Sequence, residues 1–311
     1  MMRACCLALL AGALGACARG PGPMPEGLWD AHTHLTYWGE DALDSLVKYG
    51  VVGVRDCGGD PVLLRKWRDE INRGLRRGPR IYFSGPHING PRPDSGNRLI
   101  VRTPDDARRA VDSLVKLHVD FIKTHVGIPP ATYYAVLRAA RAHHLLVASH
   151  LPDGVPAWSA VDSGAASIEH IVESILVSPM SAGYVKTLEE AMDWWASPAG
   201  DTMIVHMART GFALDPTISA YQGFIAMGRD SAERAGRQAV YDFTLKLTNR
   251  FYRAGVPILA GSDFADRDYD QRPGSSLLKE IAALEAAGLT PADAGRVAGE
   301  NIRAWLRRRV P

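Results

Sequence analysis

Short apolar segments alternate with longer helical patterns from Leu28 to the end of the chain. Eight segments have the length and apolar character of buried strands: Leu28–Asp30, Val51–Asp56, Arg80–Ser84, Phe121–Thr124, Leu145–Ser149, Ser167–Glu169, Phe212–Pro216 and Pro257–Gly261. Helical patterns separate them, and Ser276–Ala287 and Pro291–Arg308 follow the last strand. Strands that alternate with helices predict a parallel sheet, and eight such units predict a closed (β/α)8 barrel, an α/β fold of the TIM type.

The composition is typical of one large folded domain, which we place at residues 28–311. Hydrophobic residues make up 46% of the 311 residues, so the chain can build a large core. The formal net charge is only +2, and charges of both signs are interspersed, so we expect no nucleic acid partner. Basic runs such as Arg307-Arg308-Arg309 fall on predicted helices, where we expect them to face solvent.

The first 16 residues have the pattern of a signal peptide. Arg3 supplies a positive start, and an apolar run extends from Ala4 to Ala16. The run ends in Leu14-Gly15-Ala16-Cys17, which resembles a bacterial lipobox and implies cleavage before Cys17 and lipidation of this cysteine. Residues 17–27 would then tether the domain to a membrane of the bacterial cell envelope, in the periplasm or at the cell surface. An ordinary signal peptide with an incidental cysteine is the alternative.

Two connections are longer than the usual loops of such a fold. Residues 86–103 are rich in proline and glycine, and residues 178–200 carry Trp194-Trp195. Both connections follow predicted strands, so in a barrel they would lie over the carboxyl ends of the strands. We therefore expect them to form walls or lids of a site at that face.

Residue types that bind metal ions gather at the ends of the predicted strands. His32 and His34 lie two residues apart at the end of the first strand, so their side chains project to one face. Four further strand ends carry Lys123, His150, His170 and Asp263. In a barrel these ends meet at one face, where active sites are built. Each residue also has an ordinary explanation, such as a surface lysine, a core histidine or a helix N-cap, but their convergence favours a metal site.

The pattern resembles the amidohydrolase superfamily of metal-dependent barrel hydrolases. Within it, the chain is most similar to the imidazolonepropionase-like branch, which also holds carboxylated-lysine dipeptidases. The resemblance runs from His32 to the final helix. The supporting segments are Gly53-Val54-Arg55-Asp56, Gly78-Pro79-Arg80-Ile81, Asp120-Phe121-Ile122-Lys123, Ser167-Ile168-Glu169-His170, Ala260-Gly261-Ser262-Asp263, Gly288-Leu289-Thr290-Pro291 and Glu300-Asn301-Ile302.

The resemblance implies two divalent metal ions. His32 and His34 would bind the first ion together with Asp263, and His150 and His170 would bind the second. Imidazole and carboxylate ligands favour Zn²⁺, with manganese or iron as alternatives on ligand type alone.

The resemblance also implies a modified lysine and a proton-transfer residue. Lys123 would be carboxylated and bridge both ions, because a carbamate is an anionic two-oxygen ligand whereas an ammonium repels a cation. The two ions would activate a bridging water as hydroxide and polarise a carbonyl. Asp263 would accept the proton of that water and deliver it to the leaving group.

Other polar residues near strand ends are candidates for substrate contact. We expect this role for His87, which follows the third strand, for His125, two residues beyond Lys123, and for Tyr37. Further candidates for the pocket wall are Trp38, Asn89, Arg98, Tyr221 and Asp266.

The sequence departs from the family pattern in two places. The Gly-Gly-His that typically follows the third strand is replaced by Gly85-Pro86-His87-Ile88-Asn89, so no substrate of the branch transfers directly. The segments of the small accessory β-sandwich are largely lacking, so we expect a barrel without it. A homo-oligomer or the nearby membrane would then cover the barrel surface that the sandwich covers in relatives.

The leading hypothesis is a lipid-anchored binuclear metallohydrolase that cleaves the C–N bond of an amide or cyclic amide, with dipeptides among the candidate substrates. One alternative is a mononuclear deaminase- or lactonase-type hydrolase in which Lys123 stays unmodified. Another is a periplasmic binding lipoprotein that has lost catalysis. Metal stoichiometry separates the first two, and turnover of an amide, dipeptide and lactone panel separates both from the third.

Replacing Cys17 by serine tests the predicted lipid anchor. Serine has no thiol to carry a thioether-linked lipid, so the Cys17→Ser variant should lose its lipid label and leave the membrane fraction. Metabolic labelling with a radioactive fatty acid and membrane fractionation in a bacterial host measure both effects, with Cys57→Ser as the matched control. Wild-type protein that takes up no label would contradict the lipobox prediction.

Overall fold

The computed structural model describes residues 24–91, 98–265 and 271–308. The expected signal peptide, Cys17 and most of the tether lie outside these ranges, as does Asp266, so their roles stay predictions. Among the described residues, no helix combines the length and the apolar character needed to cross a bilayer.

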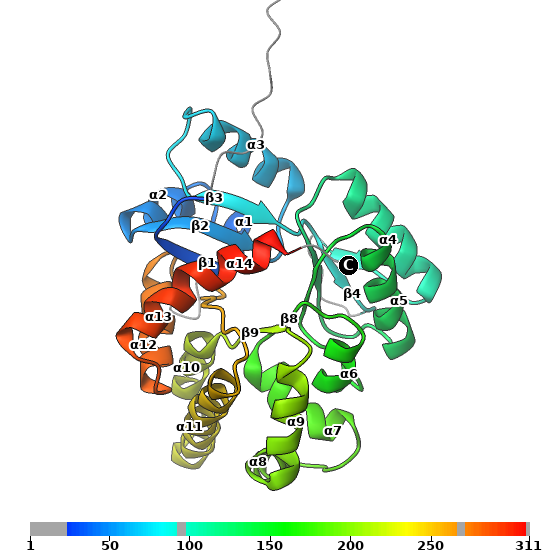
Figure 1. Cartoon of the computed structure of the whole chain (residues 1–311). Helices are drawn as coiled ribbons and strands as arrows, with labels where there is room; N and C mark the ends of the chain where they lie inside the picture. Colours follow the sequence, from blue (N-terminus) through cyan, green and yellow to red (C-terminus); the bar gives the residue numbers. More distant parts are fainter. Residues whose placement is uncertain (1–23, 92–97, 266–270, 309–311) are drawn as a thin grey trace, which may run out of the picture.

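Short parallel strands form the centre of the molecule (Figure 1). They are β1 (Leu28–Thr33), β2 (Val51–Asp56), β3 (Arg80–Phe83), β4 (His87–Asn89), β5 (Arg98–Ile100), β6 (Ile122–Thr124), β7 (Val147–Ser149), β8 (Ser167–Glu169) and β9 (Ala213–Asp215). Their order is β1-β2-β3 in one sheet and β5-β4-β6-β7-β8-β9 in the other. Seven of the eight predicted strands are present, and the TIM-barrel-like α/β fold is confirmed. All described strands belong to these two sheets, so none of them builds an accessory β-sandwich.

The predicted eighth strand, Pro257–Gly261, closes the barrel without becoming a regular strand. It forms a single isolated bridge, between Ile258 and Leu214 of β9. Backbone hydrogen bonds from Leu259 N to Leu214 O (2.8 Å) and from Ala31 N to Ala260 O (2.9 Å) join β9 to β1 across it. Gly261 lies so close to β1 that an added Cβ would sit 2.5 Å from His32 Cβ, so this close approach requires glycine.

Asp120 closes the other seam of the barrel, between β3 and β6. Its backbone N–H donates to Phe83 O (2.9 Å), and its carboxylate accepts a hydrogen bond from Phe83 N (2.9 Å). Arg68 binds the same carboxylate oxygen at 3.0 Å. The Asp120 side chain thus adds a hydrogen bond between the two edges of this seam that the backbone groups alone do not make.

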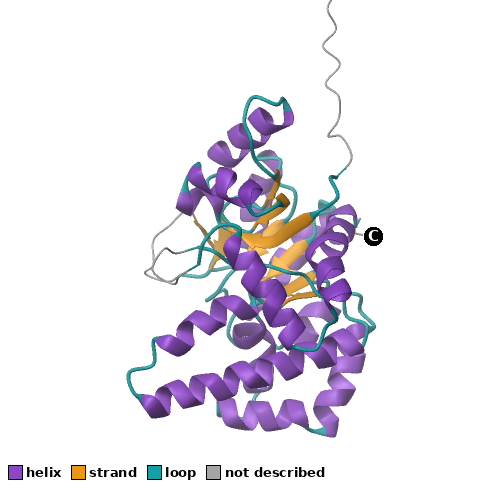
Figure 2. Ribbon diagram, turned by 90° about the vertical axis from the view of Figure 1, so that its left-hand side faces the viewer, coloured by secondary structure: helices purple, strands orange, loops and turns teal. Residues whose placement is uncertain are grey.

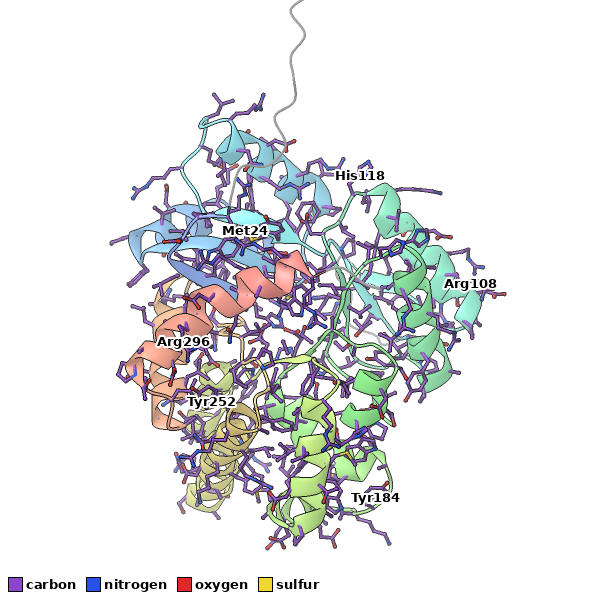
Figure 3. All side chains as sticks on the ribbon, in the orientation of Figure 1. Met24, Arg108, His118, Tyr184, Tyr252 and Arg296 are labelled. Atoms are coloured by element: carbon purple, nitrogen blue, oxygen red, sulfur yellow. The ribbon has the colours of Figure 1, made fainter. Side chains whose placement is uncertain are left out.

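Helices cover the outside of the strands (Figure 2). They are α1 (Leu35–Trp38), α2 (Asp41–Lys48), α3 (Pro61–Asn72), α4 (Pro104–Lys116), α5 (Pro130–Ala142), α6 (Ala157–Asp162), α7 (Ser178–Ser181), α8 (Leu188–Ala196), α9 (Pro198–Ala208), α10 (Ile218–Ala226), α11 (Ser231–Arg253), α12 (Ser275–Ala286), α13 (Pro291–Arg296) and α14 (Ile302–Arg307), with π-helical segments η1 (Ile171–Leu176) and η3 (Val297–Asn301). Charged side chains such as Arg108 and Arg296 lie on the outer surface (Figure 3). Arg307 and Arg308 are exposed, as predicted.

Sequence signals set where several helices begin. Thr103 and Asp106 form a capping box at α4, with Pro104 in the first helical position. Thr290 caps α13, because its hydroxyl accepts a hydrogen bond from Asp293 N at 3.2 Å.

The connection 86–103 contains two short strands rather than loop alone. β4 pairs with β6 through Ile88 and Thr124, and β5 pairs with β4. Gly90 permits this arrangement, because a Cβ at this position would lie 1.7 Å from the carbonyl oxygen of Gly127. The added strands place His87 and Asn89 at the same barrel face as the end of β6 (Figure 1).

The expectation of a long loop at residues 178–200 is wrong. This segment forms α7, α8 and the start of α9, and a capping box of Thr187 and Glu190 marks the beginning of α8. Trp195 is fully buried, and its indole N–H donates to Ile175 O at 3.0 Å. Trp194 stacks on Trp158 of α6 at a centroid distance of 5.5 Å. The tryptophans therefore anchor this segment to the barrel.

Candidate metal centre

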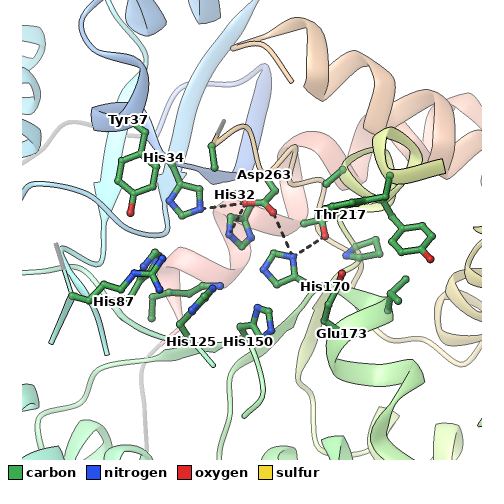
Figure 4. A pocket seen from close by; sticks show the side chains of 18 residues that line it. His32, His34, Tyr37, His87, His125, His150, His170, Glu173, Thr217 and Asp263 are labelled. Carbon is green, nitrogen blue, oxygen red and sulfur yellow. Dashed lines mark hydrogen bonds and ion pairs between the residues drawn. The ribbon is translucent and has the colours of Figure 1, made fainter. Parts of the chain in front are cut away.

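One pocket at the carboxyl ends of the strands is lined by all six predicted ligand residues (Figure 4). They come from β1 and the residue after it, from β6, from the ends of β7 and β8, and from the closing segment: His32, His34, Lys123, His150, His170 and Asp263. The barrel topology thus brings together residues that are up to 231 positions apart in the sequence (263 minus 32). Their roles as metal ligands stay predictions.

Asp263 lies at the centre of the histidines. Its Oδ1 is 3.4 Å from His32 Nε2 and 3.2 Å from His34 Nε2, and its Oδ2 is 3.7 Å from His170 Nδ1. His32, His170 and Asp263 each offer a ligand atom within 4.8 Å of the others. Burial opposes the charge of Asp263, but His32 and His34 outweigh it and hold the pKa of this carboxyl at about 2. The group is therefore ionised at neutral pH.

The polar contacts of His32 and His34 hold the Nε2 atom of each ring next to Asp263. His34 Nδ1 donates to the carbonyl of Gly58 at 3.0 Å, which leaves Nε2 as the unprotonated nitrogen of the neutral ring. His32 Nδ1 faces the carboxylate of Glu169 at 3.0 Å, with the same consequence. The Nε2 atoms of both imidazoles and a carboxylate oxygen of Asp263 then converge on one point. This donor set fits a divalent metal ion.

Lys123 is a buried basic residue that lines the same pocket. Its side chain is only 1% exposed, and its Nζ has no hydrogen-bond partner among the residues that the structure describes. Its positive charge contributes to lowering the pKa of His150 and His170, although burial is the larger cause. A buried, unpaired ammonium among histidines is costly, whereas a carbamate on Nζ would bind cations.

Six imidazole rings form a closed circuit around the pocket. Neighbouring ring centroids are 4.8 to 5.4 Å apart along the sequence His32, His34, His87, His125, His150, His170 and back to His32. Burial lowers the pKa of His150 to about 3 and that of His125 to about 2, and neighbouring positive charge adds to this effect. Burial also lowers the pKa of His34, His87 and His170, so these five rings favour the neutral form, which is the form that binds metals. His32 differs, because neighbouring acidic groups such as Asp263 and Asp215 outweigh its burial and raise its pKa.

Three residues of the pocket have left-handed backbone conformations. The φ angles are 63° at His170, 47° at Thr217 and 51° at Asp263. This region is unfavourable for residues with a Cβ, particularly for β-branched threonine. Such strain persists only where the surroundings hold it, and it is common at functional sites.

A buried charge network beneath the pocket orients His32. Arg55 of β2 donates to Glu169 Oε2 at 2.6 Å and to Asp215 Oδ2 at 3.1 Å, and both oxygens also lie within 3.3 Å of His32 Nδ1. Burial would raise the pKa of Glu169, but Arg55 and His32 lower it below the usual range. Glu169 therefore stays a carboxylate and sets the tautomer of His32. Glu169 is buried and pairs with Arg55, so it forms no surface salt bridge with the adjacent His170.

Thr217 supports His170 from the other side. Its Oγ1 lies 3.0 Å from His170 Nδ1, and the tautomer that donates from Nδ1 leaves Nε2 free as a ligand. Glu280 of α12 accepts hydrogen bonds from Ile218 N (3.0 Å) and Ser219 N (2.6 Å), which holds the start of α10 next to Thr217. The carboxylate thus stabilises the turn that presents the hydroxyl.

Two further buried carboxylates, those of Asp30 and Asp56, form hydrogen bonds with residues adjacent to Asp263 and His34. Asp30 accepts hydrogen bonds from the backbone N–H (2.9 Å) and the hydroxyl (2.5 Å) of Ser262, the residue before Asp263. Asp56 accepts a hydrogen bond from Leu35 N at 2.7 Å, directly after His34. Burial raises the pKa of each carboxyl to about 7.

The predicted substrate-contact residues line the same pocket. Tyr37 stacks on His34 with ring centroids 5.2 Å apart, and His87 stacks on His125 at 5.1 Å. Asn89 does not line the pocket, but its Oδ1 accepts a hydrogen bond from His125 Nδ1 at 3.1 Å. Of the other predicted wall residues, Arg98 and Tyr221 line the pocket and Trp38 does not.

The sequence analysis missed Arg55, Glu173 and Thr217. Arg55 and Glu169 stand within segments that carry the family resemblance, and their charges on buried strands were a signal that they pair inside the barrel. Glu173 lies on η1, and the sequence has no pattern that predicts a π-helical segment. Thr217 acts through its position at the start of α10, a helix that was not predicted.

Cys57, His32 and Glu169 form a second group of residues whose types can bind metals. The Cys57 thiol lies within 4.8 Å of ligand atoms of His32 and Glu169. Because Glu169 is already neutralised by Arg55, this set has no free anion to offer a cation. The pocket around Asp263 is therefore the better metal site.

No family model matches the sequence, and no curated protein matches it either. Solved structures nevertheless share the fold. Bottromycin amidohydrolase matches with a TM-score of 0.70 and 20% identity, over 92% of this chain and 68% of that one. A Xaa-Pro dipeptidase with methionine bound in its active site matches with a TM-score of 0.65 and 21% identity, over 91% of this chain and 75% of that one.

The Aspergillus niger ochratoxinase is a third neighbour, with a TM-score of 0.65 and 21% identity over 90% of this chain and 71% of that one. At these identities the likeness shows the fold. The neighbours are amidohydrolase-superfamily proteins, and they do not single out the imidazolonepropionase-like branch, which stays a prediction.

Removing the Thr217 hydroxyl tests whether His170 is a metal ligand held in place by Thr217. Thr217→Val keeps the shape but loses the hydrogen bond, so zinc affinity should fall by about 10- to 100-fold. Thr217→Ser keeps the hydroxyl and should bind zinc nearly as tightly as the wild type. Competition with a chromophoric chelator measures both. Equal zinc affinity in all three proteins would contradict this role.

Proposed function

We propose that the chain is a metal-dependent hydrolase that cleaves the C–N bond of amides or cyclic amides, dipeptides among them. The observation that carries the proposal is the convergence of His32 Nε2, His34 Nε2 and Asp263 Oδ1 beside the unpaired Nζ of Lys123. These groups together form a donor set suited to cations. The solved neighbours support amide chemistry, because they include an amidohydrolase and a Xaa-Pro dipeptidase.

Two divalent ions, Zn²⁺ on ligand chemistry, would be held by the six pocket residues. His32, His34 and Asp263 would hold one ion, and His150 and His170 the other. Carboxylated Lys123 would supply an oxygen to each. When bound, the ions supply Lewis acidity that lowers the pKa of a water molecule and polarises the scissile carbonyl.

Asp263 is the residue that would move the proton. Its carboxylate is ionised at neutral pH and can accept a proton from the attacking water. Its contacts with three histidines and its left-handed backbone hold it in one orientation. The same carboxyl can then deliver the proton to the leaving nitrogen, since an amine is a poor leaving group unless it is protonated.

The cell envelope is the proposed location, anchored through Cys17. The apolar run and the lipobox-like Leu14-Gly15-Ala16-Cys17 support this proposal. A membrane surface or a second copy of the chain would then cover part of the barrel exterior.

The test of the proposed function is an assay of the zinc-loaded protein on amides, dipeptides and lactones. Turnover of at least one amide should stop when a chelator removes the metal and return when zinc is added. Asp263→Asn should lower kcat by about 100-fold or more, because proton transfer contributes that much, while most of the metal stays bound. Asp193→Asn, on the exposed face of α8, is the control. A wild-type rate in Asp263→Asn would refute the proton-transfer role.

Lys123 provides a separate test of the two-metal arrangement. Lys123→Gln cannot carry a carbamate, so the metal content should fall from two ions per chain to one or fewer. Elemental analysis counts the ions, and ¹³C NMR after incubation with labelled bicarbonate detects the carbamate. One ion per wild-type chain and no carbamate signal would favour the mononuclear alternative.

A further inference from the structure

The pocket has two walls of opposite character. On one side lie Arg98 of β5 and the stacked pair His87 and His125. On the other side lie residues of η1 and α10, and these are Val172, Glu173, Thr217, Ala220, Tyr221 and Phe224. The metal-ligand residues lie between the two walls (Figure 4). A substrate at the metal centre therefore meets one arginine and two histidines of lowered pKa at one end and a carboxylate among aromatic rings at the other.

Glu173 is an acidic group of this pocket without an assigned role. It lies beside His170 and Thr217 and remains accessible to solvent (Figure 4). Although part of the residue is exposed, protein surrounds its carboxyl, and this desolvation together with the nearby Asp263 raises its pKa to about 6. No lysine, arginine or histidine among the described residues offsets this shift. At pH 7 to 8 the side chain is mainly a carboxylate without a cationic partner.

Two aromatic residues share the wall with Glu173. Tyr221 and Phe224 lie on α10 with ring centroids 6.0 Å apart. Glu173 contributes to raising the pKa of Tyr221, which places the phenol within electrostatic reach of the carboxylate. A carboxylate beside aromatic faces is the usual environment for an ammonium group, which gains from both the anion and the ring quadrupoles.

We propose that Glu173, together with Tyr221 and Phe224, binds a protonated amine of the substrate, so that the enzyme prefers amides with a free amino group on the α10 side of the scissile bond. This inference rests on the proposed amide hydrolysis. The orientation follows from charge, because Arg98 on the opposite wall would repel the same amine.

Two matched substrates test the inference. Met-Pro carries a free amino group, and N-acetyl-Met-Pro has the same scissile bond without the positive charge. The wild-type enzyme should favour Met-Pro. In Glu173→Gln, kcat/KM for Met-Pro should fall by about 10- to 100-fold, the loss expected for a hydrogen bond to a charged group, while the value for the acetylated substrate stays unchanged. Glu173→Lys should reverse the preference.

Controls separate recognition from other effects. Glu189→Gln removes a carboxylate from the exposed first turn of α8 and should leave both substrates unaffected. Metal content and the thermal unfolding midpoint of Glu173→Gln should match the wild type. If the variant loses metal, or if its kcat/KM falls equally for both substrates, Glu173 acts on the metal site or the fold, and the inference is overturned.

A binding measurement separates the inference from the proposed function. Calorimetry of the zinc-loaded Asp263→Asn variant, with and without Glu173→Gln, reports amine recognition without turnover. Tighter binding of Met-Pro that depends on Glu173 supports the inference even if the wild type cleaves neither substrate, a result that would count against the proposed function alone. Turnover without any dependence on Glu173 overturns the inference alone.

Discussion

The structure of the site depends on one buried ionic contact, that of Arg55 with Glu169 and Asp215. A charge inside a barrel is tolerated only when it is paired and hydrogen-bonded, and Arg55 of β2 meets this condition through partners on three other strands, β1, β8 and β9. It also donates to Ala31 O on β1 (2.5 Å) and to Ser167 Oγ on β8 (3.0 Å), and its guanidinium lies 4.7 Å from the ring centroid of Trp305. The network fixes the tautomer of His32, so the strand arrangement and the metal-binding nitrogen are determined together.

The second constraint is an imbalance of charge within the pocket. Lys123, Arg98 and six histidines face one carboxylate at the centre, Asp263, and one on the α10 wall, Glu173. Burial resolves part of the imbalance by lowering the pKa of every pocket histidine except His32, and carboxylation of Lys123 would resolve more of it while creating a metal ligand. The imidazole lone pairs that remain explain why the site is suited to cations. Arg98 and Glu173 lie on opposite walls, so the two ends of the pocket differ in charge.

Much of the barrel was predictable because its signals are local. Apolar segments such as Val51–Asp56 and the caps at Thr103 and Thr290 specify strands and helix starts within a few residues. The strand-end residues could be assigned to one face because barrel topology brings carboxyl ends together. The aromatic helices at 178–200 were missed because loop length was weighed without the packing of Trp194 and Trp195. The closing segment at 257–261 was predicted as a strand, but it pairs with β9 through one isolated bridge and with β1 through a backbone hydrogen bond.

The sequence by itself determined the barrel class and the residue types at the metal centre, since strand periodicity and topology suffice to bring His32, Lys123, His150, His170 and Asp263 to one face. Only the tertiary structure decided how these groups are oriented. Glu169 and Gly58 select the tautomers of the β1 histidines, and the left-handed backbones of His170, Thr217 and Asp263 are stabilised by neighbours distant in sequence. Tautomers, strained dihedral angles and the opposed walls of Arg98 and Glu173 all arise from contacts between separate strands and helices, and no local sequence pattern encodes them.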